Sequence, residues 1–287
     1  KFLYFFMLKI YGKIEDSIRS DSDDRIKVKV IKKEKDLEYK VYKIINGRLY
    51  TDRIHDTAII LENKIIEGPS FQLRDNNNSE ISNNIVFEKG TPRKLRKLNG
   101  VAASLLTGGG GNSNYWHWLY DVLPRFGLCS RSVNLSEIDY FLLPNLLKNF
   151  QNETLDCLNI PKHKRISSEK FRHIKAKELI MTDHPVVTTG NPTKDMLNIP
   201  GWIMSWLKNS FLDRDIITNK KVKNKIYIDR GETTYKNLPQ RLISNEDEIK
   251  KCLLKNDFIA VKLHDTKFRE QVDLFHNAEC IVGLHGG

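Results

Sequence analysis

The alternation of strands and helices near the end of the chain constrains the fold more than any other feature of this sequence. Three short apolar segments and two amphipathic ones follow each other as strand, helix, strand, helix, strand, at 225–228, 245–254, 258–263, 267–278 and 280–284. Strands joined through helices pair in parallel, because a parallel pair needs a long crossover connection. We therefore expect an α/β fold in which helices cover a parallel sheet. The last strand runs directly into a glycine-rich end, so we expect a fragment that lacks at least the next covering helix.

The first part of the chain predicts a different, β-rich structure. Short apolar or alternating runs are separated by polar turns, at 26–31, 41–45, 58–61 and 85–87. For the apolar start, Lys1–Tyr11, we expect a strand or a buried segment rather than the remnant of a signal or anchor.

Three regions follow from these patterns. Residues 1–95 form the β-rich lead-in, and residues 96–212 alternate strand and helix, as a Rossmann-like domain does. The polar, basic stretch at 213–224 is the best linker. We therefore predict that 213–287 is a second Rossmann-like domain, and that it is incomplete.

The composition is that of a globular protein with a basic surface. Hydrophobic residues make up 40% and charged residues 29% of the chain, which excludes a disordered or fibrous protein. Lys and Arg exceed Asp and Glu by 11, which favours anionic partners such as phosphates, acidic glycans, nucleic acid or a membrane surface. The positive charges are scattered, so a solvated basic surface is the simplest interpretation, with peripheral membrane association as the alternative. We do not expect a nucleic-acid binder, because all four tryptophans fall in amphipathic helices.

The four cysteines bear on the compartment. None forms a CxxC pair and each lies in or beside an apolar segment, so we expect buried free thiols. Free thiols fit a reducing compartment. We predict a cytoplasmic protein, with the inner face of the membrane, or the secretory-pathway lumen if an N-terminal anchor was removed, as alternatives.

The first candidate site is the segment 108–125, GGGGNSNYWHWLYDVLPR, in which a glycine run leads into a helix. Four glycines in a row are costly unless a backbone must approach something closely, and we assign Gly110 and Gly111 to an acceptor-side loop. Asn114, with the two polar residues before it, is a candidate helix cap. The spacing i, i+3, i+4, i+7 predicts the buried stripe of this helix: Trp116, Leu119, Tyr120 and Leu123.

A polar stripe follows another face of the same helix. His117, Asp121 and Arg125 stand four residues apart, although Pro124 should end or kink the helix near Leu123. A carboxylate one turn from an imidazole can orient it and raise its pKa, which suits a base that removes a proton from a hydroxyl. The alternative is an ordinary helical ion-pair stripe worth a few tenths of a kcal/mol per pair. His117 and Asp121 are both candidates for the catalytic base, and Arg125 is an acceptor-side residue.

A second candidate site follows the strand at 225–228. Arg230 stands at its carboxyl end, where ligands bind in open α/β sheets, and its planar fork suits a diphosphate. A surface ion pair with Asp229 is the alternative. Arg241, Asn245 and Glu246 follow at the start of a helix, where Asn245 serves as a cap whatever else it does.

A third candidate site is the segment 268–287, FREQVDLFHNAECIVGLHGG. Glu270 lies in the first helical turn, where a carboxylate can accept hydrogen bonds from ribose hydroxyls or simply be solvated. After the last strand, small residues and a histidine would let backbone N–H groups approach a phosphate or a sugar: Gly283, His285, Gly286 and Gly287.

Taken together, these blocks resemble glycosyltransferase family 61, which includes bacterial capsular-polysaccharide enzymes, plant arabinoxylan xylosyltransferases and animal O-linked N-acetylglucosaminyltransferases. The matching stretches are 115–125, 227–231 with 241–249, and 270–287, so the resemblance covers the chain from about residue 100. It implies a GT-B fold, in which two Rossmann-like domains face each other across a cleft. It also implies a nucleotide-sugar donor and inversion at the anomeric carbon. The family continues after its His-Gly pair with Ala-Gly and a helix, whereas here Gly287 follows and the chain ends.

Our hypothesis for the mechanism is a single in-line displacement. His117 or Asp121 would activate a hydroxyl of a glycan or glycoconjugate acceptor. Arg230, Arg241 and the 283–287 turn would meet the charge on the leaving nucleoside diphosphate. We find no acidic pair of the DxD kind at the expected donor site, so we expect no obligatory metal, and no cofactor besides the donor substrate. The alternative is a nucleotide-sugar-binding protein, or an inactive fragment, without transfer activity.

Overall fold

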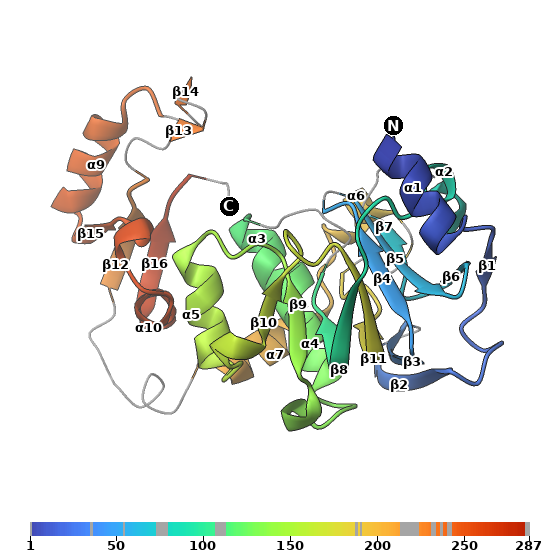
Figure 1. The fold of residues 1–287 in the computed structure, drawn as a ribbon. Helices are drawn as coiled ribbons and strands as arrows, with labels where there is room; N and C mark the ends of the chain where they lie inside the picture. Colours follow the sequence, from blue (N-terminus) through green and yellow to red (C-terminus); the bar gives the residue numbers. More distant parts are fainter. Residues whose placement is uncertain are drawn as a thin grey trace. The chain divides into compact units, whose positions relative to one another are not determined.

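The computed structural model describes residues 2–34, 37–53, 55–72, 80–106, 113–186, 189, 191–212, 224–230, 234–235, 238–239 and 243–284. These residues form a mixed α/β structure with a large mixed sheet and a small parallel sheet (Figure 1). The chain divides into two compact units, Lys1–Lys148 with Asn159–Trp206, and Asn149–Leu158 with Leu207–Gly287. Each unit has its own main sheet.

The sheet of the first unit is mixed, and β11 joins its antiparallel and parallel parts. β11 (His173–Thr182) pairs antiparallel with β3 and β4 on one side and parallel with β8 on the other, and β8, β9 and β10 continue the parallel part. Most of the remaining strands extend the antiparallel part, and β1 is added at its edge by a parallel pairing with β6. The strands are β1 (Asp16–Ile18), β2 (Ile26–Glu34), β3 (Leu37–Ile45), β4 (Arg48–Thr51), β5 (Asp56–Leu61), β6 (Lys64–Ile66), β7 (Phe71–Gln72), β8 (Arg96–Ser104), β9 (Tyr140–Leu143) and β10 (Arg165–Ser167). Strands of the predicted lead-in and of the region after it therefore share one sheet.

The helical segments of the first unit are short. The described ones are α1 (Phe2–Tyr11), η2 (Ile81–Asn83), α2 (Ile85–Lys89), α3 (Tyr115–His117), the π-helix η3 (Trp118–Val122), α4 (Leu123–Cys129), η4 (Leu135–Glu137), η5 (Lys162–Lys164), α6 (Pro192–Asp195) and α7 (Gly201–Phe211), which begins in this unit. The α3–η3–α4 segment connects β8 to β9, as a crossover between parallel strands requires.

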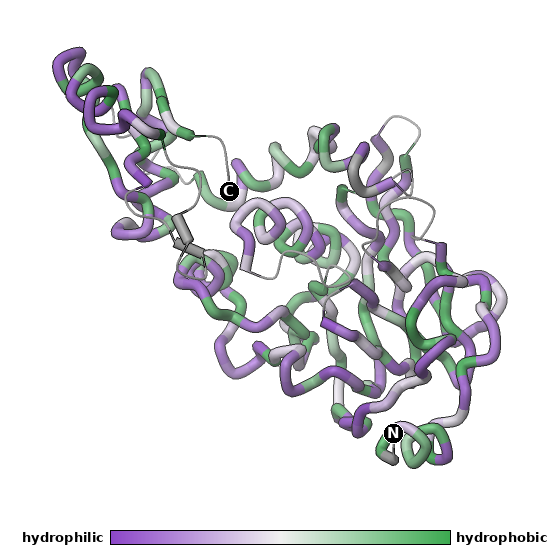
Figure 2. Tube along the Cα trace, turned by 90° about the horizontal axis from the view of Figure 1, so that it is seen from above, coloured by the Kyte–Doolittle hydropathy of each residue, from purple (hydrophilic) through white to green (hydrophobic). Residues whose placement is uncertain are grey.

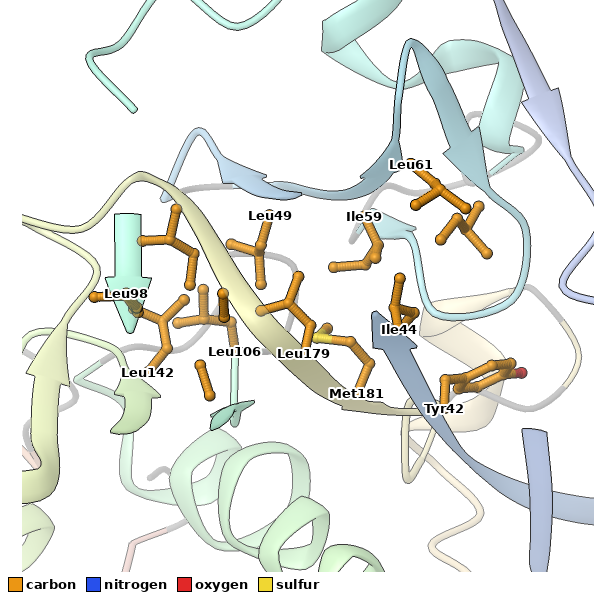
Figure 3. Close-up of a cluster of buried hydrophobic side chains, with 14 of the residues drawn as sticks. Tyr42, Ile44, Leu49, Ile59, Leu61, Leu98, Leu106, Leu142, Leu179 and Met181 are labelled. Atoms are coloured by element: carbon orange, nitrogen blue, oxygen red, sulfur yellow. The ribbon is translucent and has the colours of Figure 1, made fainter. Parts of the chain in front are cut away.

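The core of the first unit lies on both faces of the sheet. Successive residues of a strand point to opposite faces, and every residue of β5 is buried. Ile59 joins a large cluster that also contains Leu49 and Leu179 (Figure 3), whereas Ile60 joins a smaller cluster on the other face. Each of these four side chains is fully buried, which contributes about 1.5–3 kcal/mol per side chain.

The second unit contains the predicted parallel sheet. β12 (Asn224–Ile228) lies between β15 (Phe258–Val261) and β16 (Ala278–Val282), parallel to both, so the strand–helix alternation read from the sequence is confirmed. Phe268, at the start of one of its helices, packs its ring against Phe211 at 4.9 Å, and its N–H donates to Glu153 Oε2 at 2.6 Å. The other described elements are β13 (Thr234–Tyr235), β14 (Leu238–Pro239), α5 (Asn149–Cys157), α9 (Glu246–Lys255), η6 (Leu263–Asp265) and α10 (Phe268–His276).

Two secondary-structure predictions for the first unit are wrong. The segment expected to be a strand or buried is the helix α1, because an apolar run of this length without alternation fits a helix equally well. The strand expected at 85–87 is part of α2, which the side chain of Asn84 caps and Gly90, at φ 61°, terminates. The two cap residues carried the helix signal, and they outweigh the short apolar run between them.

The prediction of buried thiols is wrong for three of the four cysteines. All four are free; Cys129 is buried, whereas Cys157, Cys252 and Cys280 are exposed. Apolar neighbours of two of these cysteines, Leu254 and Ile281, are themselves 49% and 47% exposed, so an apolar stretch of sequence does not by itself imply burial.

Candidate functional site

The helix that follows the glycine run begins where the sequence places its cap. Asn114 Oδ1 accepts the backbone N–H groups of Trp116 at 2.9 Å and His117 at 3.3 Å, as an N-cap side chain does. The role of Asn114 as a cap is therefore confirmed. Gly110 and Gly111 lie outside the described residues.

The helix then widens for one turn. Over η3 the chain is a π-helix, in which the N–H of Leu123 donates to the carbonyl of Trp118 five residues earlier. Pro124 follows at the start of α4 and has no N–H to continue the ordinary i to i−4 pattern. Single π turns inside helices occur frequently at functional sites.

The side chains that face inward on this helix are mostly not the predicted ones. Trp118, Asp121 and Arg125 are buried, at 0%, 0% and 1% exposure, whereas Trp116 and Tyr120 are only partly buried. The predicted apolar stripe is therefore wrong for all its members except Leu123. Asp121 and Arg125 lie on the inward face, so they do not form a solvated ion-pair stripe.

His117 and Asp121 form a close pair. His117 Nδ1 lies 2.6 Å from Asp121 Oδ2, and the exposed fraction of the side chain is 22% for His117 and 0% for Asp121. Burial raises the pKa of Asp121, while the hydrogen bond from His117 and the charge of Arg125 oppose that rise. When Nδ1 carries the proton of the neutral ring, it donates to the carboxylate and Nε2 is left as a proton acceptor.

Arg125 is a buried cation tied to the backbone rather than to a carboxylate. Its Nε donates to the carbonyl of Asp121 at 3.1 Å, and its Nη1 donates to the carbonyl and hydroxyl of Thr182 at 3.3 and 3.4 Å. Burial lowers the pKa of Arg125 to about 10, so the guanidinium stays charged at neutral pH. It therefore brings a fixed positive charge close to the His117–Asp121 pair.

The structure adds residues that the sequence interpretation missed. Thr182 ends β11, and Asp183 and His184 follow at the carboxyl end of this strand. Asp183 accepts hydrogen bonds from Tyr42 Oη at 2.7 Å and from the N–H of Lys40 at 2.8 Å. The sequence did contain a signal for Asp183 and His184, because polar residues directly after a predicted parallel strand mark the edge of an α/β sheet where ligands bind.

Charges on the helix at 115–129 affect the pKa values of Asp183 and His184. Burial raises the pKa of Asp183, and the charge of Arg125 is among the influences that oppose the rise. Burial and the nearby charges of Arg125 and His117 hold the pKa of His184 well below its usual value. His184 is therefore neutral, and the cluster holds one permanent cation among two carboxyl groups.

The cluster also contains unsatisfied polar atoms. Among the described residues, Asp121 Oδ1 and Arg125 Nη2 are buried and make no hydrogen bond. Buried polar atoms are nearly always bonded, so each exception calls for an explanation, and a role in the chemistry of a site is one of them. The part of the chain that the structure describes holds no group of three or more His, Cys, Asp or Glu side chains placed to bind a metal ion.

In the second unit, Asp229, 6% exposed, pairs with Lys250 Nζ of α9 at 2.5 Å. Arg230 is partly buried, and its Nη1 has no hydrogen-bond partner within the described ranges. A guanidinium with a buried, unused donor at the carboxyl end of β12 suits an anion.

The helix start that follows is used in part by the fold itself. Tyr227 Oη donates a hydrogen bond to Glu246 Oε1 at 2.7 Å, which links α9 to β12. Asn245 occupies the N-cap position, but its side chain makes no capping bond and lies 3.4 Å from Glu248 Oε2. The prediction of Asn245 as a cap is thus right in position and wrong in its hydrogen bond. Arg241 lies outside the described residues.

Glu270 and Gly283 take part in local packing. Glu270 Oε2 accepts the N–H of Lys267 at 2.8 Å, which caps α10. Its side chain also lines a hollow of about 320 Å³ together with Thr266 and Asp273. A Cβ added at Gly283 would lie 3.1 Å from the Cβ of Ile228, so a larger residue would crowd the end of β12. His285, Gly286 and Gly287 lie outside the described residues.

Comparison with known families identifies the chain. The family model described as Glycosyltransferase 61 matches residues 115–287, which is more than half of the sequence. The matched range includes the His117–Asp121 pair and the parallel sheet of the second unit. The class is thus that of the glycosyltransferases, enzymes that transfer a sugar from a donor to an acceptor. The chain belongs to glycosyltransferase family 61. No curated protein matches it.

Proposed function

We propose that this protein is an inverting glycosyltransferase of GT-B architecture that moves a sugar from a nucleotide-sugar donor to a hydroxyl of a glycan or glycoconjugate. The family match supports sugar transfer. The strand–helix alternation in the second unit and the parallel part of the sheet in the first support two Rossmann-like domains. The observation that carries the mechanism is the His117–Asp121 pair, in which an accessible imidazole is backed by a buried carboxylate.

His117 is the base in this proposal, and Asp121 orients it. An acceptor hydroxyl can reach a side chain that is 22% exposed but not one that is 0% exposed. His117 Nε2 takes the hydroxyl proton while the acceptor oxygen forms a bond to the anomeric carbon, and the bond from that carbon to the diphosphate oxygen breaks on the opposite face. Asp121 holds the ring in the tautomer that leaves Nε2 basic and stabilises the imidazolium that forms.

The second unit binds the donor in this proposal. Arg230 meets the charge of the leaving diphosphate, which its buried, unused Nη1 donor supports. Glu270 binds the ribose, because it lines a hollow of about 320 Å³ and its carboxylate can accept hydrogen bonds from hydroxyls. We assign the remaining predicted donor contacts to the same ligand: Arg241, Asn245, Glu246, Gly283, His285, Gly286 and Gly287.

Turnover of the purified protein, measured as release of nucleoside diphosphate over a panel of nucleotide-sugar donors, tests the assignment. His117→Ala should lower kcat by about 10²- to 10⁴-fold, the usual contribution of a general base. Asp121→Asn should cause a loss of similar order, because it favours the wrong tautomer. His163→Ala is the matched control, since His163 is an exposed histidine of the same unit.

Donor binding, followed separately by calorimetry, should be unchanged in all three variants. Full turnover of His117→Ala would reject the base assignment. Saturable binding of a nucleoside diphosphate by the wild-type protein, with no turnover of any donor, would instead identify a nucleotide-sugar-binding protein without transfer activity.

A further inference from the structure

The outward face of α1 is apolar and exposed. Leu3, Phe5, Phe6 and Ile10 are 53%, 62%, 50% and 53% exposed, and they lie with Lys9 on one side of the helix. Figure 2 shows this segment, next to the N-terminus, mostly in the colours of hydrophobic residues. Scattered exposed apolar residues are normal, but a contiguous group on one short helix marks an interaction surface.

The opposite face of α1 holds the helix on the first unit, beside α2 (Figure 1). Tyr4 Oη donates to the carbonyl of Glu88 at 3.0 Å, and Leu8 packs so closely on Gly90 that an added Cβ would lie 2.7 Å from it. Tyr11 Oη accepts the N–H of Leu95 at 2.8 Å, and its ring contacts His173 edge-on at 4.9 Å. Because the inner face is anchored, the outer apolar face is displayed in a fixed orientation.

A basic hollow adjoins this apolar face. Leu3 and Tyr4 of α1 line it together with Lys89, Arg93 and Arg172, and its volume is about 370 Å³. Asp52 is the one acidic residue among the lining residues.

The cations of the hollow are crowded and one of them is fixed. The charges of Arg93 and Arg53 help to lower the pKa of Arg172, after burial itself. Arg172 is held by hydrogen bonds to the carbonyls of Thr51 at 3.2 Å and Asp52 at 3.1 Å. A cluster of guanidinium and ammonium groups at an open hollow suits a phosphate.

We propose that α1 and this hollow form a docking surface for a bilayer that contains anionic phospholipid. Helices that lie in the membrane interface place aromatic and aliphatic side chains among the acyl chains and basic ones at the headgroups. Here Phe5 and Phe6 enter the bilayer, while Lys89, Arg93 and Arg172 bind lipid phosphates. The helix Phe2–Tyr11 is about 15 Å long, half the thickness of the hydrocarbon core, so these residues fit along the surface. None of the described helices is long and apolar enough to span a bilayer.

Charge favours lipid over a second copy of the chain as the occupant. A symmetric pair formed through α1 would bring two basic hollows together, and like charges in contact repel. An anionic bilayer offers the opposite charge next to an apolar layer, which matches both parts of the surface. The excess of 11 basic residues in the whole chain acts in the same direction.

Flotation of the full protein with vesicles tests this proposal. We expect the protein to float with phosphatidylcholine–phosphatidylglycerol vesicles and to bind phosphatidylcholine vesicles much less. The double variant Phe5→Glu/Phe6→Glu should lose about tenfold or more of its vesicle partitioning. The matched control is Leu197→Glu/Met204→Glu, which also adds two charges at exposed apolar positions, 82% and 42% exposed, and should bind as the wild type does.

A second variant separates the hollow from the helix. Lys89→Gln/Arg93→Gln should weaken binding to the anionic vesicles and make it less sensitive to salt, because fewer lysine and arginine side chains contact the phosphates. Absence of flotation of the wild type, or unchanged flotation of Phe5→Glu/Phe6→Glu, would overturn the proposal. Full displacement of the protein from the vesicles by inorganic phosphate would also overturn it, because that result indicates a site for soluble anions. A shift from dimer to monomer in Phe5→Glu/Phe6→Glu, with flotation retained, would overturn it as well.

Discussion

Replacing Arg125 with Met should destabilise the first unit by about 3–5 kcal/mol, the usual cost of removing one partner from a buried charge cluster. Arg125 is 1% exposed and donates three hydrogen bonds, at 3.1, 3.3 and 3.4 Å, to the backbone of Asp121 and to Thr182. Met fills similar space but supplies no donor and no charge. Because a folded unit is stable by only about 5–15 kcal/mol, the loss would be a large fraction of the total.

The size of this loss should depend on pH in a definite direction. Burial raises the pKa values of Asp121 and Asp183, and the charge of Arg125 opposes both rises. Without Arg125 the two pKa values rise further. A carboxyl whose pKa is higher in the folded than in the unfolded state contributes its stability at low pH and loses it as pH increases through the folded-state value. The deficit of Arg125→Met should therefore be larger at about pH 8 than at about pH 5.

Urea unfolding followed by tryptophan fluorescence measures this deficit, and fully buried Trp118 lies on the same helical segment. Arg131→Met is the control, because Arg131 is an exposed arginine just after α4, and its change should stay within about 0.5 kcal/mol. If the two variants unfold at the same urea concentration, Arg125 does not balance the carboxylates. A deficit that is equal at both pH values would contradict the electrostatic origin of the loss, even if its size is as expected.

Two further predictions concern the same helix. Gly127→Ala should destabilise the first unit by about 1–3 kcal/mol, because the added Cβ would lie 2.6 Å from the indole of Trp206; Trp206→Phe in the same background should recover part of the loss in a thermal melt. Asn114→Ala should lower the stability by about 1 kcal/mol, because it removes the cap on the N–H groups of Trp116 and His117. Asn114→Asp should retain the cap. Equal melting temperatures for these two variants would show that the cap contributes nothing.

Several local features could be predicted from the sequence because they depend on residues a few positions apart. The parallel sheet of the second unit follows from the strand–helix alternation. The cap at Asn114 and the one-turn spacing of His117 and Asp121 are also local. The family was recognisable because its motifs survive in order along the chain.

Burial and long-range partners required the tertiary structure. Local spacing predicted the wrong inward face for the helix at 115–129, because the face that is buried depends on the elements that pack against the helix and not on its own sequence alone. Arg125 finds Thr182, which is 57 positions away in the sequence, and no periodicity encodes such a contact. The helical form and exposed face of α1 were equally hidden, since a continuous apolar run fits a strand or a helix.

The sequence by itself therefore determined the alternation of elements and the chemistry available at each position. The tertiary structure decided which of two neighbouring ionisable groups, His117 or Asp121, reaches solvent. That difference arises because hydrogen-bond patterns and caps are set by adjacent residues, whereas the solvent exposure of a side chain depends on every strand and helix that packs around it.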